Sequence, residues 1–273
     1  MRLFVTGASS FVGAHFSSLA SREGFVVHAL HRNTPLELRG VVPVRGDVTT
    51  TRPSPGTEVV VHLATKVMAA DALEQNRRML DVVLSWGLPV VYASSTVVHW
   101  PRQNAYARSR LEDEARLRES GLPFLIVRPC APYGPRHREH EPAHKESFHT
   151  LSRMCRKLPF VPIMGQGNYR RQPVHVDDFN GAILRLIQAG TWGGEYDAGG
   201  PEAMTLREII KKLGGKRVIP IPRAVIRVAG PLAGLHSDVV STFDTDDVVD
   251  PGPLAAASGL TPRDFDAGAL ANV

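Results

Sequence analysis

The fold of this chain is decided by the stretch Thr6-Gly7-Ala8-Ser9-Ser10-Phe11-Val12-Gly13, which joins an apolar strand to an apolar helix. Before it, Leu3-Phe4-Val5 forms a short β-type run, and after it apolar residues recur at helical spacing from Phe11 to Leu19. A second apolar strand follows over residues 25–30. We therefore predict a βαβ unit with parallel strands and a right-handed crossover.

A turn of this kind is typical of a pyrophosphate site. Gly7 lets the chain turn tightly, Gly13 lets the helix approach the strand, and unpaired N–H groups at the helix N-terminus attract phosphate. Ser10 replaces the middle glycine of the dinucleotide fingerprint, and its hydroxyl could bind a phosphate. An ordinary turn is the alternative. The predicted cofactor loop consists of Gly7, Ser9, Ser10, Phe11, Val12 and Gly13.

The end of the second strand carries a cation. An enzyme that prefers NAD usually has a carboxylate here for the ribose 2′-hydroxyl, whereas a 2′-phosphate needs a positive charge. The chain reads His31-Arg32-Asn33, and the guanidinium of Arg32 suits a phosphate. We predict a preference for NADP(H) over NAD(H); the alternative is an ordinary surface arginine.

Composition places the chain among globular proteins, since 43% of its 273 residues are hydrophobic and 22% are charged. The net charge is +5, but the basic residues fall in small groups, so we expect no nucleic-acid partner. No apolar run is long enough to span a bilayer, and we expect no membrane partner. The two cysteines cannot build a disulfide scaffold, which favours a cytoplasmic location.

Three further buried-type strands end in small or polar residues: residues 41–44 before Asp47, residues 59–63 before Ala64, and residues 90–94 before Ser95. Helical patterns at about 69–86 and 104–119 separate them. We therefore predict an α/β fold, a doubly wound parallel sheet of the Rossmann type. In such a sheet the ligand lies across the carboxyl ends of the strands.

With these pieces in order, the chain resembles the extended short-chain dehydrogenases/reductases, the NAD(P)-dependent epimerase/dehydratase family. The resemblance covers nearly the whole chain. The motifs that carry it are residues 6–13, Gly46-Asp47-Val48, Val61-His62-Leu63-Ala64, Tyr92 to Ser95, Tyr106 to Arg110, Arg128-Pro129, Tyr133-Gly134-Pro135 and Val174-His175-Val176-Asp177-Asp178.

The resemblance implies a site that moves hydride and a proton. Ser95 would hydrogen-bond the substrate oxygen, and Tyr106 would be the acid/base. A phenol is a poor base at neutral pH, so a positive charge is needed nearby, and one helical turn later is the place for it. The family has lysine there, but this chain has Arg110. Arginine keeps the charge and can hydrogen-bond a ribose, although it cannot join a proton relay. The alternative for Arg110 is a surface cation paired with Glu114.

The resemblance also implies which further residues contact the cofactor. Asp47 and Val48 would contact the adenine, and Leu63, Ala64 and Thr65 would line the groove, with Pro129 completing it alongside Tyr106 and Arg110.

On the substrate side we expect Thr96 as a reserve hydroxyl and Arg171 as a phosphate contact or, equally, a surface arginine. Cys130-Ala131 stands where nucleotide-sugar epimerases usually have an asparagine, and this difference weakens the prediction of a nucleotide sugar as substrate. The histidines at 137, 140, 144 and 149 do not share a helix face, so we predict a mobile, hydrated flap and no metal site.

The resemblance divides the chain into a Rossmann domain and a smaller C-terminal substrate lobe. Residues 1–130 would form the domain, with 171–200 returning to it, and residues 131–170 and 201–273 the lobe. It further implies a homodimer, formed by the helices over 69–86 and 104–119.

The predicted function is NAD(P)-dependent hydride transfer of the epimerase/dehydratase type, on a small-molecule substrate such as a nucleotide sugar. One alternative is an NADPH-dependent ketone or aldehyde reductase. Another is a non-catalytic nucleotide-binding sensor or scaffold.

Overall fold

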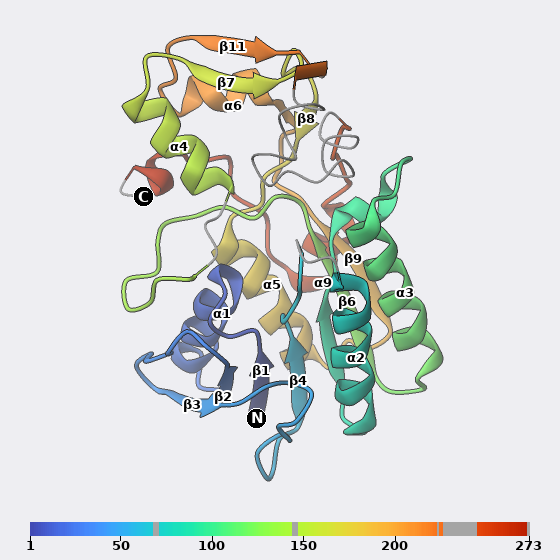
Figure 1. Ribbon diagram of the computed structural model, residues 1–273. Coiled ribbons are helices and arrows are strands. Elements are labelled where there is room, and N and C mark those ends of the chain that lie inside the picture. Colours follow the sequence, from blue (N-terminus) through green and yellow to red (C-terminus); the bar gives the residue numbers. More distant parts are fainter. Residues whose placement is uncertain (68–70, 144–146, 223, 226–244, 272–273) are drawn as a thin grey trace.

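The computed structural model describes residues 1–67, 71–143, 147–222, 224–225 and 245–271. Its centre is a seven-stranded parallel sheet in the order β3-β2-β1-β4-β5-β6-β9 (Figure 1). The strands are β1 (Arg2–Thr6), β2 (Val26–His31), β3 (Val41–Arg45), β4 (Val59–His62), β5 (Val90–Ala93), β6 (Phe124–Pro129) and β9 (Gly194–Ala198). The order reverses beside β1, as in a doubly wound Rossmann sheet, so the predicted fold class is confirmed.

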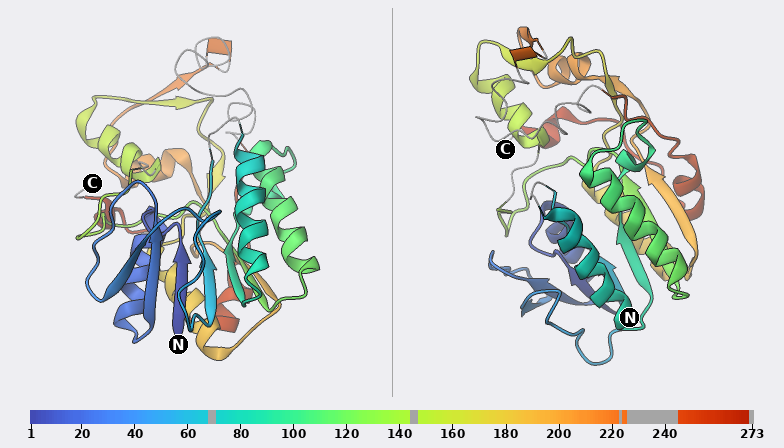
Figure 2. Two further views of the ribbon diagram at one scale, coloured as in Figure 1. Left: turned by 60° about the horizontal axis from the view of Figure 1, so that its bottom comes forward. Right: turned by 45° about the vertical axis from the view of Figure 1, so that its right-hand side comes forward.

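Helices cover both faces of the sheet (Figures 1 and 2). Leu3 and Val5 of β1 point into one core, which α1 (Phe11–Arg22), α5 (Val176–Ala189) and α9 (Gly252–Ser258) complete. Phe4 points into the other, shared with α2 (Ala72–Ser85) and α3 (Ala105–Glu119). Alternate residues of a strand point to opposite faces, which is why a continuous apolar run forms a strand buried on both sides.

A smaller lobe lies beyond the carboxyl ends of the strands (Figure 1). In it α4 (Ser147–Lys157), α6 (Leu206–Lys212) and the 3₁₀ helix η3 (Ala267–Leu270) surround an apolar core. Two small sheets pair β7 (Val161–Met164) with β11 (Val218–Ile221), and β8 (Arg170–Arg171) with β10 (Met204–Thr205).

The packing at α9 differs from the domain boundaries expected from the sequence. The sequence predicts that residues 171–200 return to the Rossmann domain, where β9 pairs with β6. It predicts residues 201–273 in the lobe, yet α9 packs on α5 and β9, with Leu254 in their core. A seven-residue helix offers too few apolar positions for its partner to be read from periodicity.

Two features of the described residues bear on the expected partners and ligands. No helix among them is long and apolar enough to cross a membrane. Nor does any group of three or more histidine, cysteine, aspartate or glutamate side chains in those ranges come together as a candidate metal centre.

Candidate active site

A cleft of about 790 Å³ opens at the carboxyl ends of β1, β2, β3 and β4, within the size range of small-molecule sites. Most of the residues predicted to hold a cofactor line it together. From the predicted set these are Gly7, Ser9, Ser10, Arg32, Asp47, Val48, Leu63, Ala64 and Thr65.

The loop from β1 to α1 fits a dinucleotide because its glycines let the backbone segments approach closely. Gly7 has a φ of +68°, and a Cβ atom there would lie 2.5 Å from the Ala64 nitrogen. A Cβ on Gly13 would lie 2.3 Å from the Gly7 carbonyl oxygen. Both are distances that real Cβ atoms do not tolerate, so glycine is required here. This approach leaves the N-terminus of α1 beside the cleft, where its free N–H groups suit a pyrophosphate.

Ser10 has a structural task that its sequence position alone does not reveal. Its side chain accepts a hydrogen bond from the Gly13 amide at 3.0 Å and so caps α1. The hydroxyl proton is not used in that bond. Ser10 can therefore cap the helix and still donate to a phosphate oxygen.

Phe11 and Val12 turn away from the cleft. Phe11 is buried and packs edge-on against His15 and His149. The Val12 carbonyl accepts a hydrogen bond from Asn180 of α5 at 3.3 Å. The Val12 side chain packs against the core on this side, so both side chains hold the loop from behind, and their backbone remains as the candidate contact for the cofactor.

Arg32 and Asp47 form an ion pair across the edge of the cleft. Arg32 Nη1 lies 2.9 Å from Asp47 Oδ2, and 48% of the arginine side chain is exposed. Hydrogen bonds from the Thr49 hydroxyl and amide, reinforced by Arg32, lower the pKa of Asp47 to about 2. Asp47 is therefore ionised at neutral pH and pre-oriented by its own loop, whereas Arg32 depends on it only through an exposed contact.

Part of the cleft wall comes from the loop after β4 and from the helix α2, and the sequence does not predict it. Lys66, Glu74, Gln75, Arg78 and Met79 line the cleft. Asn76 is buried and fixes this wall: its amide accepts from the Lys66 amide at 2.8 Å and donates to the Lys66 carbonyl at 2.9 Å. A buried asparagine on an amphipathic helix was the available signal, since such a group needs hydrogen-bond partners.

The predicted catalytic residues lie at the carboxyl end of β5 and on the helix that follows the next connection. The Ser95 side chain accepts from the Val97 amide at 3.5 Å and begins the 3₁₀ helix η1 (Thr96–His99). Tyr106 lies in the first turn of α3, which Asn104 caps through the Ala107 amide at 2.8 Å. Thr96 is buried and donates to the Pro129 carbonyl at 3.4 Å, so it joins the ends of β5 and β6.

Arg110 is not a surface cation paired with Glu114, which was the alternative role for it. Its side chain is 1% exposed, and Nη2 lies 3.0 Å from Oδ2 of Asp113. Its Cζ atom lies over the ring of Tyr106, 5.3 Å from the ring centre. Glu114 instead pairs with Arg118 and Arg128 and accepts from Ser94. The tertiary packing thus directs Arg110 inward, close to the predicted acid/base.

Arg171 lies in the lobe among aromatic side chains. Its guanidinium lies over Tyr169 at 4.7 Å and over Trp100 at 5.6 Å, measured to the ring centres. Trp100 in turn donates to Asp247 at 3.2 Å. The aromatic faces fix the plane of the guanidinium, and they bring the lobe against the connection that follows β5.

The histidine-rich segment packs against the domain instead of lying free over it. The His140 ring donates to the Ser9 carbonyl at 2.9 Å, and the His137 ring lies 2.9 Å from the Ser18 hydroxyl. His149 donates to the Gly134 carbonyl at 2.9 Å. Three of the four histidines thus contact backbone or α1, whereas His144 lies outside the described residues, and the mobile, hydrated flap stays a prediction.

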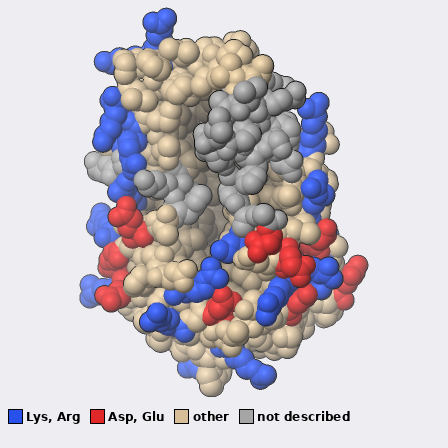
Figure 3. All heavy atoms as spheres, in the orientation of Figure 1, with Lys and Arg blue, Asp and Glu red and all other residues tan. Residues whose placement is uncertain are grey.

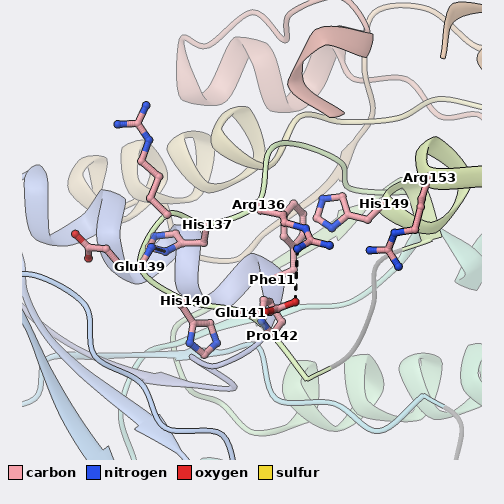
Figure 4. A pocket seen from close by; sticks show the side chains of 10 residues that line it. Phe11, Arg136, His137, Glu139, His140, Glu141, Pro142, His149 and Arg153 are labelled. Atoms are coloured by element: carbon pink, nitrogen blue, oxygen red, sulfur yellow. Dashed lines mark hydrogen bonds and ion pairs between the residues drawn. The ribbon is translucent and has the colours of Figure 1, made fainter. Parts of the chain in front are cut away.

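A second cavity of about 370 Å³ lies beside Phe11, between this segment and α4. Arg136, His149 and Arg153 converge on it, and Arg136 pairs with Glu141 at 3.6 Å (Figure 4). Burial lowers the pKa of His149, so its ring adds no charge at neutral pH.

On the face seen in Figure 3, which is hollowed below the lobe, basic and acidic side chains are interspersed over the described residues.

Comparison with known proteins places the chain in a family. The model of the NAD dependent epimerase/dehydratase family matches residues 3–199. Among curated proteins, the chain is 26% identical to a ceramide reductase of Caulobacter vibrioides, over 87% of this chain and 79% of the relative. It is also 26% identical to a dTDP-4-dehydro-6-deoxy-D-allose reductase of Streptomyces bikiniensis, over 94% of this chain and 93% of the relative.

Solved structures share the fold over almost the full length. MoeE5 in complex with UDP-glucuronic acid and NAD has a TM-score of 0.77 at 19% identity, covering 100% of this chain and 97% of that one. The UDP-glucose 4-epimerase of Thermus thermophilus in complex with NAD has a TM-score of 0.75 at 20% identity, covering 99% and 97%. The chain therefore belongs to the NAD dependent epimerase/dehydratase family and is an enzyme of that type.

Proposed function

We propose that this enzyme transfers a hydride between a nicotinamide and a carbon that bears a hydroxyl or carbonyl oxygen, with Tyr106 as the acid/base. The observation that carries the proposal is the buried guanidinium of Arg110, 5.3 Å from the centre of the Tyr106 ring. A fixed positive charge beside the ring favours the anionic phenolate over the neutral phenol.

Each residue has a separate task in this reaction. The Ser95 hydroxyl donates a hydrogen bond to the substrate oxygen and orients it. The Tyr106 hydroxyl donates its proton to that oxygen in the reductive direction and takes it back in the oxidative direction. Arg110 stabilises the phenolate that forms between these events. The nicotinamide, when bound, supplies or accepts the hydride.

For the cofactor we propose NADP(H) in preference to NAD(H). Arg32 follows β2 at the edge of the cleft, and the nearest carboxylate, Asp47, comes from the loop after β3. An exposed ion pair is worth about 0–1 kcal/mol, so a 2′-phosphate can take Arg32 from Asp47 at little cost. Asp47 and Val48 then contact the adenine, and Leu63, Ala64 and Thr65 line the groove.

This cofactor preference favours net reduction of a ketone or aldehyde. A reductase consumes NADPH in each turnover and must release the oxidised form, whereas a redox-neutral epimerase or dehydratase keeps its nucleotide. The two curated relatives described above are both named as reductases. A second candidate is a redox-neutral reaction on a nucleotide sugar, which Arg171 favours because a planar guanidinium suits a diphosphate.

The test is the Tyr106→Phe variant, assayed by NADPH oxidation with a dTDP-linked 4-dehydro-6-deoxyhexose and with simple aliphatic ketones and aldehydes. We expect at least about a 10²-fold loss of kcat with unchanged binding of NADPH. Tyr196→Phe on β9 is the matched control and keeps full activity. Undiminished turnover in the Tyr106 variant contradicts the proposal and points to a nucleotide-binding sensor or scaffold.

Mass spectrometry of the purified protein separates the two candidate reactions. Retained NAD together with a nucleotide sugar supports the redox-neutral reaction, whereas freely exchanging NADPH supports the reductase. Tighter binding of NADH than of NADPH contradicts the proposed preference.

We also propose that two copies associate through α2 and α3, in a reducing compartment such as the cytoplasm. The two helices pack side by side on one outer face of the molecule (Figure 2), and both cysteines are unpaired and buried. Light scattering after size exclusion gives the mass directly, and a monomer at micromolar concentration contradicts the dimer.

A further inference from the structure

Arg110 and Asp113 form an ion pair that is closed off from solvent on the inner face of α3. The two side chains are 1% and 2% exposed, and the closest contact is 3.0 Å. Removing one partner of such a pair leaves an uncompensated buried charge, which is strongly destabilising. The side chains at these two positions therefore depend on each other.

The sheet supplies the second contact that fixes the pair. The Tyr92 hydroxyl donates to Asp113 Oδ2 at 2.6 Å, the same oxygen that Arg110 approaches. The Arg110 Cζ atom also lies over the Tyr92 ring, 5.2 Å from its centre. Asp113 is thus held from β5 and from α3 at once, and the guanidinium cannot move without breaking one of these contacts.

Other charged and titratable groups around the pair do not replace Asp113. His62 of β4 stacks on Tyr92, and burial, with a contribution from Arg110, lowers its pKa to about 3, so it is uncharged at neutral pH. Glu114 is occupied by Ser94, Arg118 and Arg128. Among the described residues, Asp113 is therefore the carboxylate in direct contact with Arg110, while Glu114 acts on it electrostatically without a contact of its own.

The pair is aligned with the proposed acid/base. Tyr106, Arg110 and Asp113 follow one another at intervals of four and three residues and so share a face of α3. In addition, Arg110 Nε is a buried donor without an acceptor among the described residues. An unpaired buried donor is costly, and an oxygen of a bound ligand would satisfy it.

Resting on the proposed function, we propose that Asp113 is a positioning residue for hydride transfer, holding the Arg110 guanidinium against Tyr106 and offsetting part of its charge. A lysine has fewer hydrogen-bond donors, all on one nitrogen, and its charge is compact. Arginine has a broad planar group that needs a fixed acceptor to adopt one orientation. Asp113 and Tyr92 provide that acceptor and the support behind it.

The test follows the ionisation of Tyr106 without any substrate. Tyrosinate absorbance at alkaline pH is recorded for each variant with and without the additional Tyr106→Phe change, and the difference isolates Tyr106. Asp113→Asn keeps an acceptor for Arg110 but removes the negative charge, so we expect the ionisation midpoint to fall by about one pH unit. Asp113→Ala also frees the guanidinium, and its midpoint should lie above that of the asparagine variant.

The matched control is Asp81→Asn, because Asp81 of α2 accepts a hydrogen bond at 3.0 Å from Arg116 of α3, in a partly exposed ion pair. Its midpoint should equal that of the unchanged protein. The proposal is overturned if Asp113→Asn shifts the midpoint no more than Asp81→Asn does, or if the asparagine and alanine variants coincide.

A variant that fails to fold is also informative. If Asp113→Asn is unfolded, the double variant Arg110→Met with Asp113→Asn should fold, because both buried charges are gone. Failure of the double variant overturns the mutual dependence. The titration and the activity assay test different claims. An active Tyr106→Phe enzyme contradicts the acid/base role of Tyr106, whatever the titration shows for Asp113.

Discussion

At the scale of single residues, two charged side chains of the cofactor cleft differ in how firmly other protein groups hold them. Asp47 is fixed by Thr49 within its own loop at 2.9 Å and 2.7 Å. Within the part of the chain that the structure describes, the ion pair of Arg32 is the exposed contact to Asp47. An arginine that is so weakly committed can rotate toward an incoming phosphate, whereas the aspartate keeps its place.

Arg32→Ala is therefore expected to weaken NADPH binding by about tenfold or more and to change NADH binding by less than about twofold. The reason is the loss of a charge-assisted hydrogen bond to the 2′-phosphate, worth about 1.5–3 kcal/mol. Fluorescence titration with each nucleotide measures both dissociation constants.

Arg22→Ala is the control, because it removes the same charge at the far end of α1. Equal losses for NADPH in the two variants would mean that only the overall charge matters, and would contradict a specific role for Arg32.

At the scale of elements, the start of α1 combines helix stability with ligand binding. The Ser10 side chain caps the helix through the Gly13 amide. At the start of α2, by contrast, Asp71 makes no such bond to the helix. Two helices that border the same cleft thus begin in different ways, and the difference can be measured.

Ser10→Ala is expected to reduce the free energy of unfolding by about 1 kcal/mol, because the Gly13 amide loses its acceptor. Asp71→Ala, at the uncapped position, should cost no more than a few tenths of a kcal/mol. Urea denaturation followed by circular dichroism measures both. A Ser10 variant as stable as the unchanged protein would show that water replaces the cap without loss.

At the scale of the whole molecule, buried histidines link stability to pH. Burial, with a contribution from Arg110, lowers the pKa of His62 to about 3, and burial is also the main cause that lowers the pKa of His137 to about 4. A histidine whose pKa is lowered by folding contributes its full stabilisation at pH values above about 6.5, the pKa of histidine in the unfolded chain. That stability is lost as the pH falls, because the unfolded chain binds the proton first.

Between pH 7 and pH 5, His62 alone should cost on the order of 2 kcal/mol of unfolding free energy. His62→Gln, which cannot titrate, should therefore flatten the pH dependence over this window by about one proton. Urea denaturation at a series of pH values measures the slope. A slope that is identical with and without His62 contradicts the assignment of a neutral, buried ring.

Much of the site could be predicted from local sequence. The strand, glycine turn and helix over residues 3–19 follow from short-range patterns, since apolar periodicity and the conformational freedom of Gly7 act within a few residues. The positions of Arg32, Asp47 and Ala64 at one edge follow as well, because parallel strands end together. The family resemblance added Asp47, Val48 and residues 63–65 as cofactor contacts, and nine of the predicted cofactor residues line one cleft.

Only the tertiary structure decided four features of the molecule. They are the inward direction of Arg110, its contacts with Asp113 and Tyr92, the hydrogen bond of His140 to Ser9, and the packing of α9 on the sheet. Each joins groups from different elements or chooses between partners equally spaced on one helix. Sequence spacing offers Arg110 both Asp113 and Glu114, and only the packing of α3 on β5, which engages Glu114 elsewhere, selects between them.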